Sequence, residues 1–271
     1  SNLNIGTGGL NVTVDDNTSS SADKGVISGA ISGGGVLAKS GAGTLELTGA
    51  NSHSNLSLLG GTVRVGHANA LGTGAASLDN SSVKLEFASD TALTVANQIN
   101  ATVSSTTLSS DRATAGAGLT HSVGALQLTG SNVIAFAKGA NVTSGTAGLS
   151  TGAVSLGGTT TFQVNNGVAA TLASLTGTNT NVTFSSTGST TASGAVTTGA
   201  GTLTKNGAGT LTLNGSSTRT GATTLSAGTL AVGHDTALGS GTISLTGTGA
   251  TLDLAADSAL SVANQVTVSV L

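Results

Sequence analysis

The feature that most limits what this chain can fold into is a duplicated unit. Lys39-Ser-Gly-Ala-Gly-Thr-Leu-Glu-Leu-Thr-Gly49 reappears as Lys205-Asn-Gly-Ala-Gly-Thr-Leu-Thr-Leu-Asn-Gly215, and Gly61-Thr-Val-Arg-Val-Gly-His67 reappears as Gly228-Thr-Leu-Ala-Val-Gly-His234. The unit covers about 35–103 and again about 201–270, and a diverged middle of about 104–200 separates the copies. Repeated units inside one chain are typical of proteins whose units bury their apolar faces against one another.

Short alternating segments fill each unit. Thr44–Thr48, Thr62–Val65, Val83–Phe87 and Leu93–Val95 all place apolar residues two apart. This period indicates strands with one buried face, and the Gly, Asn and Asp residues between the segments favour turns. Helix-forming residues are scarce, so the pattern predicts an all-β fold.

A solenoid fits these strands better than a sandwich or a barrel. The chain has only four Phe and no Trp or Tyr to fill a wide core, and it has no Pro, so strands can pair on both edges. We therefore predict a right-handed parallel β-helix, a β-solenoid rod that occupies 1–271 as a single domain and forms part of a larger protein. At roughly 20–25 residues per coil, the chain would form about 11–13 coils.

The alternation also predicts which side chains point inward. The offset between the two copies grows by a single position between Ala50 and Leu56, so we place that insertion in a turn. Glu46, Arg64, Lys84 and Glu86 should point outward. The inward residues of the first unit are expected to be Leu45, Leu47, Leu58, Val63, Val65, Leu78, Leu85, Phe87, Leu93 and Val95. Their partners at equivalent coil positions are expected to be Leu211, Leu213, Leu225, Leu230, Val232, Leu245, Leu252, Leu254, Leu260 and Val262.

The composition argues against several functions. The net charge is −3, and the eight Lys and Arg residues are scattered, which argues against nucleic-acid binding. No apolar run approaches the ~20 residues of a membrane-spanning helix. The absence of Cys excludes disulfides and thiolate metal sites.

The duplicated segments resemble a known repeat family. Lys205–Gly215 and Thr220–Gly233 are similar to the autotransporter-associated β-strand repeat, also called the passenger-associated transport repeat. The first copy, Lys39–Gly66, is similar but has Gly60-Gly61 in place of the Ala-Gly pair. The resemblance implies a type V secreted passenger with a right-handed β-helix outside a Gram-negative outer membrane.

We predict no catalytic, cofactor or metal site, and hence no enzyme. His67 and His234 share a repeat position, which favours a structural role in a turn, and neither they nor His53 and His121 belong to a metal motif. Gly33-Gly34-Gly35 precedes no helix, so it is not expected to hold phosphate.

The carboxylates do not form a recognisable motif either. Asp15-Asp16-Asn17 with Asp23 is the densest acidic group, but it lacks the glycine-framed pattern of calcium-binding β-rolls. Glycoside cleavage needs two carboxylates about 5–10 Å apart, whereas Glu46, Glu86, Asp79 and Asp90 are spread along the sequence.

The predicted function is a structural stalk or scaffold segment of a secreted, surface-exposed bacterial protein that supports outer-membrane secretion and display. The alternatives are an adhesin or self-association module, as in cell–cell adhesion or biofilm, and a section of an extracellular filament. Partners would be neighbouring rods or host or bacterial surfaces. Both ends, Ser1 and Leu271, are expected to be cut from something longer. The diverged middle is expected to be less stable than the duplicated units and to carry any protruding loops.

Overall fold

The chain is all-β in the computed structural model, which describes residues 2–17, 23–254 and 260–269. The described residues contain no helix, and accordingly no helix among them is long and apolar enough to cross a membrane. The structure confirms the all-β parallel solenoid predicted from the sequence. Ser1, Val270 and Leu271, used above to describe the ends, lie outside the described residues.

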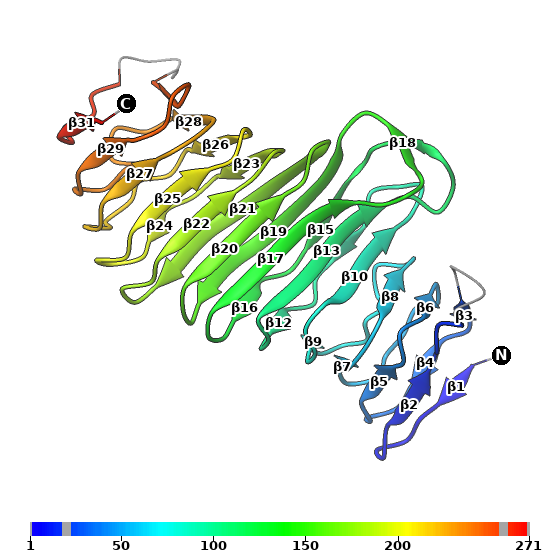
Figure 1. Cartoon of the computed structure of the whole chain (residues 1–271). Helices are drawn as coiled ribbons and strands as arrows, with labels where there is room; N and C mark the ends of the chain where they lie inside the picture. The colour runs from blue at the N-terminus through cyan, green and yellow to red at the C-terminus, as the bar shows by residue number, and fades with distance from the viewer. Residues whose placement is uncertain (1, 18–22, 255–259, 270–271) are drawn as a thin grey trace.

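Two long parallel sheets run along the molecule, and the strands on their main paths alternate between the two sheets along the chain (Figure 1). The first, called the β3–β31 sheet, has 12 strands. In spatial order these are β3 (Lys24–Ile27), β6 (Thr44–Leu47), β8 (Thr62–Val65), β10 (Val83–Ala88), β13 (Ser105–Asp111), β17 (Asn132–Lys138), β20 (Thr160–Val164), β22 (Val182–Ser185), β25 (Leu203–Asn206), β27 (Thr223–Leu225), β29 (Ile243–Leu245) and β31 (Val266–Val268).

The second, called the β2–β30 sheet, has 15 strands, of which 12 form its main path. These are β2 (Leu10–Thr13), β5 (Leu37–Ser40), β7 (Leu56–Leu58), β9 (Ala76–Leu78), β12 (Ile99–Ala101), β16 (Leu126–Leu128), β19 (Ala147–Leu156), β21 (Val168–Gly177), β23 (Ser189–Ala192), β26 (Thr210–Leu213), β28 (Thr229–Val232) and β30 (Thr251–Asp253). Beside this path lie β11 (Thr94–Val95), β15 (Thr120–Val123) and β24 (Val196–Thr197).

One coil contains one strand of each sheet, so the 12 strands of the β3–β31 sheet fit the predicted number of coils. Coil length varies: Thr44 pairs with Thr62 across a short coil, whereas Ser105 pairs with Val133 across a much longer one. The longer coils carry a small sheet of β14 (Gly116–Ala117) and β18 (Val142–Ser144), which protrudes from the rod in Figure 1. A second small sheet joins β1 (Leu3–Asn4) to β4 (Ile31–Ser32). The expectation that protruding loops come from the middle is confirmed.

The core lies between the two sheets. All ten inward residues predicted for the first unit are buried, and they stack in register: Leu45 pairs with Val63, which pairs with Leu85. The insertion between the copies falls in the turn between β6 and β7, as expected. Alternation along a strand was therefore enough to identify the buried face.

The two copies of the unit occupy opposite sheets, which the sequence did not predict. In the first copy β5 and β7 belong to the β2–β30 sheet, whereas their equivalents β25 and β27 belong to the β3–β31 sheet. Leu45 and Leu211 are both buried, but they reach the core from opposite sides. The expectation of equivalent coil positions is therefore correct for the inward direction and wrong for the sheet. An alternating strand fits either sheet, because both have a buried inner face.

The second unit is less buried than predicted near the end of the chain. Leu211, Leu213, Leu225, Leu230 and Val232 are buried, as expected. Leu254 is 47% exposed, which contradicts the prediction, and only partial burial is found at Leu245, Leu252, Leu260 and Val262. No further described coil covers this end, so side chains there lack the neighbour that would complete their burial.

The diverged middle contains packing features that its sequence did not suggest. Its strands β19 and β21 are the longest, at 10 residues each. Inside the same region Phe136, Phe162 and Phe184 form a buried column, with ring centroids 6.4 Å and 5.4 Å apart. Sequence divergence there accompanies wider coils with larger side chains, and the lower stability expected of the middle stays a prediction.

Candidate functional sites: a charged cluster and buried polar groups

Charged side chains gather on the outer face of the β3–β31 sheet. Glu46 of β6 lies next to Arg64 of β8, and Arg64 lies next to Glu86 of β10, because the three residues are register partners. Lys84 also belongs to this face. The predicted outward direction is confirmed, although Glu86 is only 6% exposed because its neighbours cover it.

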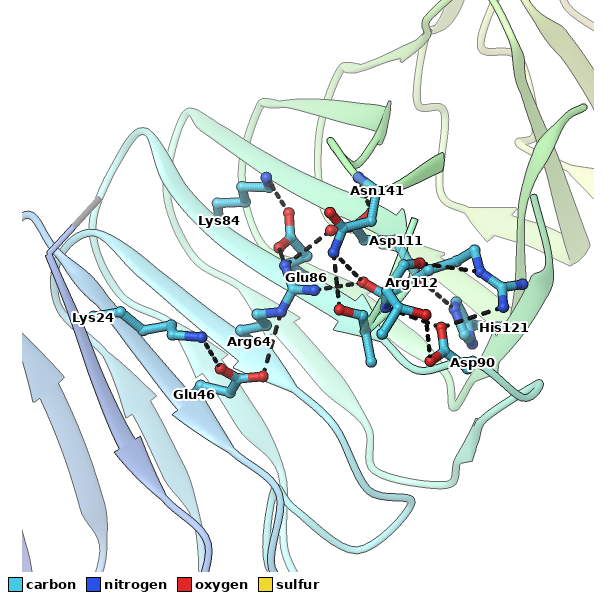
Figure 2. Close-up of polar contacts among 12 residues, drawn as sticks. Lys24, Glu46, Arg64, Lys84, Glu86, Asp90, Asp111, Arg112, His121 and Asn141 are labelled. Atoms are coloured by element: carbon cyan, nitrogen blue, oxygen red, sulfur yellow. Dashed lines mark hydrogen bonds and ion pairs between the residues drawn. The ribbon is translucent and has the colours of Figure 1, made fainter. Parts of the chain in front are cut away.

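Arg64 is the centre of this charged cluster (Figure 2). Its Nη1 lies 2.6 Å from Oε1 of Glu86 and 2.8 Å from Oδ2 of Asp111, and its Nε lies 3.5 Å from Oε1 of Glu46. The other carboxylate oxygen of Glu46 pairs with Lys24 at 2.6 Å, and Glu86 also pairs with Lys84. One guanidinium thereby neutralises carboxylates from three strands.

The cluster also anchors the protruding segment. Asp111, at the end of β13, is buried and accepts a hydrogen bond from the backbone N–H of Asn141 at 2.9 Å. Arg64 and the side-chain amide of Asn141 both donate to the carbonyl of Arg112. Arg112 in turn pairs with Asp90 at 3.2 Å, and hydrogen bonds from Thr114 lower the pKa of Asp90. The two loops that carry β14 and β18, which follow β13 and β17, are thus tied to the rod at Arg64 and Asp111.

This arrangement corrects the view that the carboxylates are separate. Glu46 and Glu86 lie on different coils and are distant in sequence, yet both contact Arg64. Asp111 and Arg112 had not been singled out at all. The sequence spacing could have indicated this cluster, because Arg64 lies one coil after Glu46 and one coil before Glu86. A hollow of about 260 Å³ over Lys24, Thr44, Arg64 and Glu86 is lined by groups already engaged in ion pairs.

His67 and His234 have the structural role predicted for their shared repeat position. Nδ1 of His67 accepts the backbone N–H of Asn69, and Nδ1 of His234 accepts the backbone N–H of Thr236, both at 3.1 Å. Each imidazole therefore caps a turn that follows an equivalent strand.

The other two histidines are buried inside the rod. Nδ1 of His121 accepts the backbone N–H of Leu93 at 3.0 Å, and its Nε2 lies 2.8 Å from the carbonyl of Asp111. Both ring nitrogens of His53 are buried without a hydrogen-bond partner among the described residues. Burial lowers the pKa of both side chains, because a charged imidazolium is poorly solvated there. Neutral histidines of this kind serve packing.

Arg219 occupies the repeat position of His53 in the second copy and is also fully buried. Its guanidinium donates to the carbonyl of Gly221 at 2.9 Å and to the hydroxyl of Thr223. Burial lowers its pKa to about 10. Two unrelated side chains therefore fill the same corner of the coil.

The acidic side chains near the start of the chain do not point toward a common site. Asp15 and Asp16 are exposed, and the carboxylate of Asp23 accepts the backbone N–H of Asn17. Across residues 2–17, 23–254 and 260–269, no three His, Asp or Glu side chains are arranged to hold a metal ion. At Gly33 and Gly35 the backbone packs closely against Gly6 and Gly9, which explains these two glycines by coil-to-coil contact.

The remaining hollows are polar and uncharged. Two of them measure about 450 and 420 Å³. Asn97 helps to line the smaller of these and donates to the carbonyls of Gly72 and Gly74. Its equivalent in the second copy, Asn264, repeats this pair of bonds with the carbonyls of Gly239 and Gly241. Asn97 is thus a repeated structural element of the turn.

Comparison with known families agrees with the duplicated segments. Residues 37–65 and 203–232 each match the family model of the passenger-associated transport repeat. No curated protein and no solved structure is significantly similar to the chain. The resemblance inferred from the sequence is therefore confirmed at both copies.

Proposed function

We propose, starting from the two passenger-associated transport repeats that this chain carries, that it is a rod segment of a secreted autotransporter-type passenger on the surface of a Gram-negative bacterium. In this role it supports secretion by folding outside the cell and holds other parts of the passenger away from the membrane.

The observation that carries the proposal is the unbroken stack of coils. Twelve strands of the β3–β31 sheet follow one another in sequence order, and each of the ten inner strands is paired with the strand before it and the strand after it. Along the stack the coils bury Leu, Val and Ile side chains, at about 1.5–3 kcal/mol each before the entropy of ordering the chain is subtracted. A polymer that gains stability one coil at a time suits both vectorial folding and a stiff spacer.

A structural role also fits two carboxylates that lie close together, because both already have a bonding partner. The carboxylates of Glu86 and Asp111 lie close to one another, but Arg64 bonds both. A general acid or base needs a free position near a substrate, and these oxygens are instead engaged in holding a loop. We therefore propose that the segment is not an enzyme.

Surface display in the bacterium tests this function. The full-length protein should be detected on intact cells by protease shaving, and Leu213→Asp should sharply reduce the amount displayed, because an unpaired carboxylate at this buried position costs several kcal/mol. Thr212→Asp, at the neighbouring outward position, is the matched control and should be displayed normally. Equal display of both variants, or absence of the wild-type protein from the surface, would refute the proposal.

A second candidate, self-association, is favoured by one feature of the outer surface. Hydroxyl side chains form a continuous column along six neighbouring strands of the β3–β31 sheet, comprising Thr161, Thr183, Thr204, Thr224, Ser244 and Thr267. Such an uncharged, regular face could hydrogen-bond to a second rod. Light scattering over a range of concentrations separates the two functions: a spacer stays monomeric, whereas a self-adhesive rod increases in mass unless Thr204→Lys and Thr224→Lys block the face.

A further inference from the structure

Two lysines, one in each repeat, are completely buried and hold the same cage of backbone carbonyls. Nζ of Lys39 donates to the carbonyls of Ser40, Gly41 and Gly60 at 2.7, 2.8 and 3.1 Å. In the second copy, Nζ of Lys205 makes the equivalent bonds at 3.3, 2.7 and 3.1 Å, to the carbonyls of Asn206, Gly207 and Ala227. The repetition of all three contacts shows that the cage belongs to the repeat.

The cage satisfies the ammonium fully and joins two coils. An ammonium has three N–H donors, and each lysine meets three acceptors. Two acceptors lie in the turn that directly follows the lysine, whereas Gly60 and Ala227 lie in the stacked turn of the next coil. Burial lowers the pKa of both amines, and the charge of Asp15 opposes this effect at Lys39. The cage is complete only when the following coil is in place.

Glycine at the turns permits this close approach. Gly41 and Gly207 have φ of 78° and 84°, and Gly61 and Gly228 have φ of 65° and 70°. A Cβ on Gly228 would lie 2.8 Å from Nζ of Lys205 and 2.5 Å from the carbonyl oxygen of Gly207. The spacing of lysine and glycines that marks the repeat in sequence is thus the spacing that builds the cage.

The outer surfaces of the two copies do not share such a feature. Glu46 and Arg64 of the first copy correspond to Thr212 and Ala231 of the second. The equivalent strands also lie in opposite sheets, so the two copies present their outer residues on opposite sides of the rod. A partner that recognised both repeats would have to bind two different surfaces facing in different directions.

We propose that Lys39 and Lys205 are the positioning residues of the transport repeat: each ammonium clasps the turn of its own coil to the turn of the next, and the repeat acts through this internal clasp and not through a recognised outer face. The inference rests on the proposed function, because it assigns the part of the rod that makes folding of one coil depend on its neighbour.

Hydrogen exchange on the purified chain tests the clasp directly. In Lys39→Met with Lys205→Met the apolar stems are kept but the buried carbonyls lose their donor. Amides at 41–44 and 60–62, and at 207–210 and 227–229, should exchange roughly tenfold faster or more. Amides of β13 to β19 should keep their rates. Unchanged exchange at the four turns would overturn the proposal.

Display of the full-length protein tests whether the repeat acts through the buried lysine clasp or through its outer face. The double Met variant should reach the cell surface in severalfold lower amount. The control places glutamates on the outside at equivalent positions of the two repeats, Thr44→Glu with Thr210→Glu, and should be displayed like the wild type. Loss of display in this control, with the purified variant still folded, would show recognition from outside and overturn the clasp. Absence of the wild type from the surface would instead refute the proposed function, whatever the exchange data show.

Discussion

Removal of Arg64 should detach the two protruding loops from the rod. Arg64→Met keeps the apolar stem of the side chain but leaves Asp111 and Glu86, with side chains 1% and 7% exposed, without the guanidinium that they share. Breaking a buried ion pair on one side costs about 3–5 kcal/mol, because the remaining charge is poorly solvated. Asp111 keeps its bond from Asn141 and Glu86 keeps Lys84, so the lower part of that range is expected.

The measurement is native-state hydrogen exchange, because a repeat protein need not unfold in one step. Amides at 111–119 and 138–146 should exchange at least roughly a hundredfold faster in Arg64→Met, as a loss of about 3 kcal/mol implies. Lys24→Met is the control: Lys24 is 48% exposed in its pair with Glu46, and such pairs contribute about 0–1 kcal/mol. Adding Glu86→Gln and Asp111→Asn to Arg64→Met should recover part of the protection. If Arg64→Met and Lys24→Met behave alike, the loops are not held by this cluster.

Three further predictions concern the core and the histidines. Burial holds the pKa of His53 below its ordinary value of 6.5, so the unfolded chain binds the proton first as the pH falls. The free energy of unfolding should therefore decrease below about pH 6.5. His53→Leu should remove that part of the pH dependence, as measured by urea titrations at several pH values. Phe162→Ala should cost roughly 3–5 kcal/mol by opening the phenylalanine column, against about 1 kcal/mol for Phe162→Leu, and equal urea midpoints for the two would contradict the packing. Replacing both His67 and His234 by Asn, which keeps a turn-capping acceptor, should leave the melting curve and surface display unchanged; loss of display with the fold intact would reveal a site at these histidines.

The local alternation of this sequence was sufficient for the fold class and for the buried face. Leu45, Val63 and Leu85 were predicted to point inward because a period of two places every second side chain on the same side of a strand, and this holds for any sheet that the strand joins. The placement of His67 and His234 in equivalent turns also followed from their repeated position, whereas their capping hydrogen bonds are visible only in the structure. These inferences needed only short-range geometry.

Only the tertiary structure decided which residues meet across coils. Contacts such as Arg64 with Asp111 depend on the lengths of all the coils between them, and those lengths differ from one coil to the next. The coil lengths also determine that the two repeats occupy opposite sheets. They determine where the loops anchored by Asp111 leave the rod as well. The alternation of apolar residues carries no information on coil length, because a turn can gain or lose residues without changing which face of the next strand is buried. The lysine clasp was hidden for a related reason: a lysine at an inward position is costly until carbonyls from two stacked turns surround it, and that enclosure exists only in the folded rod.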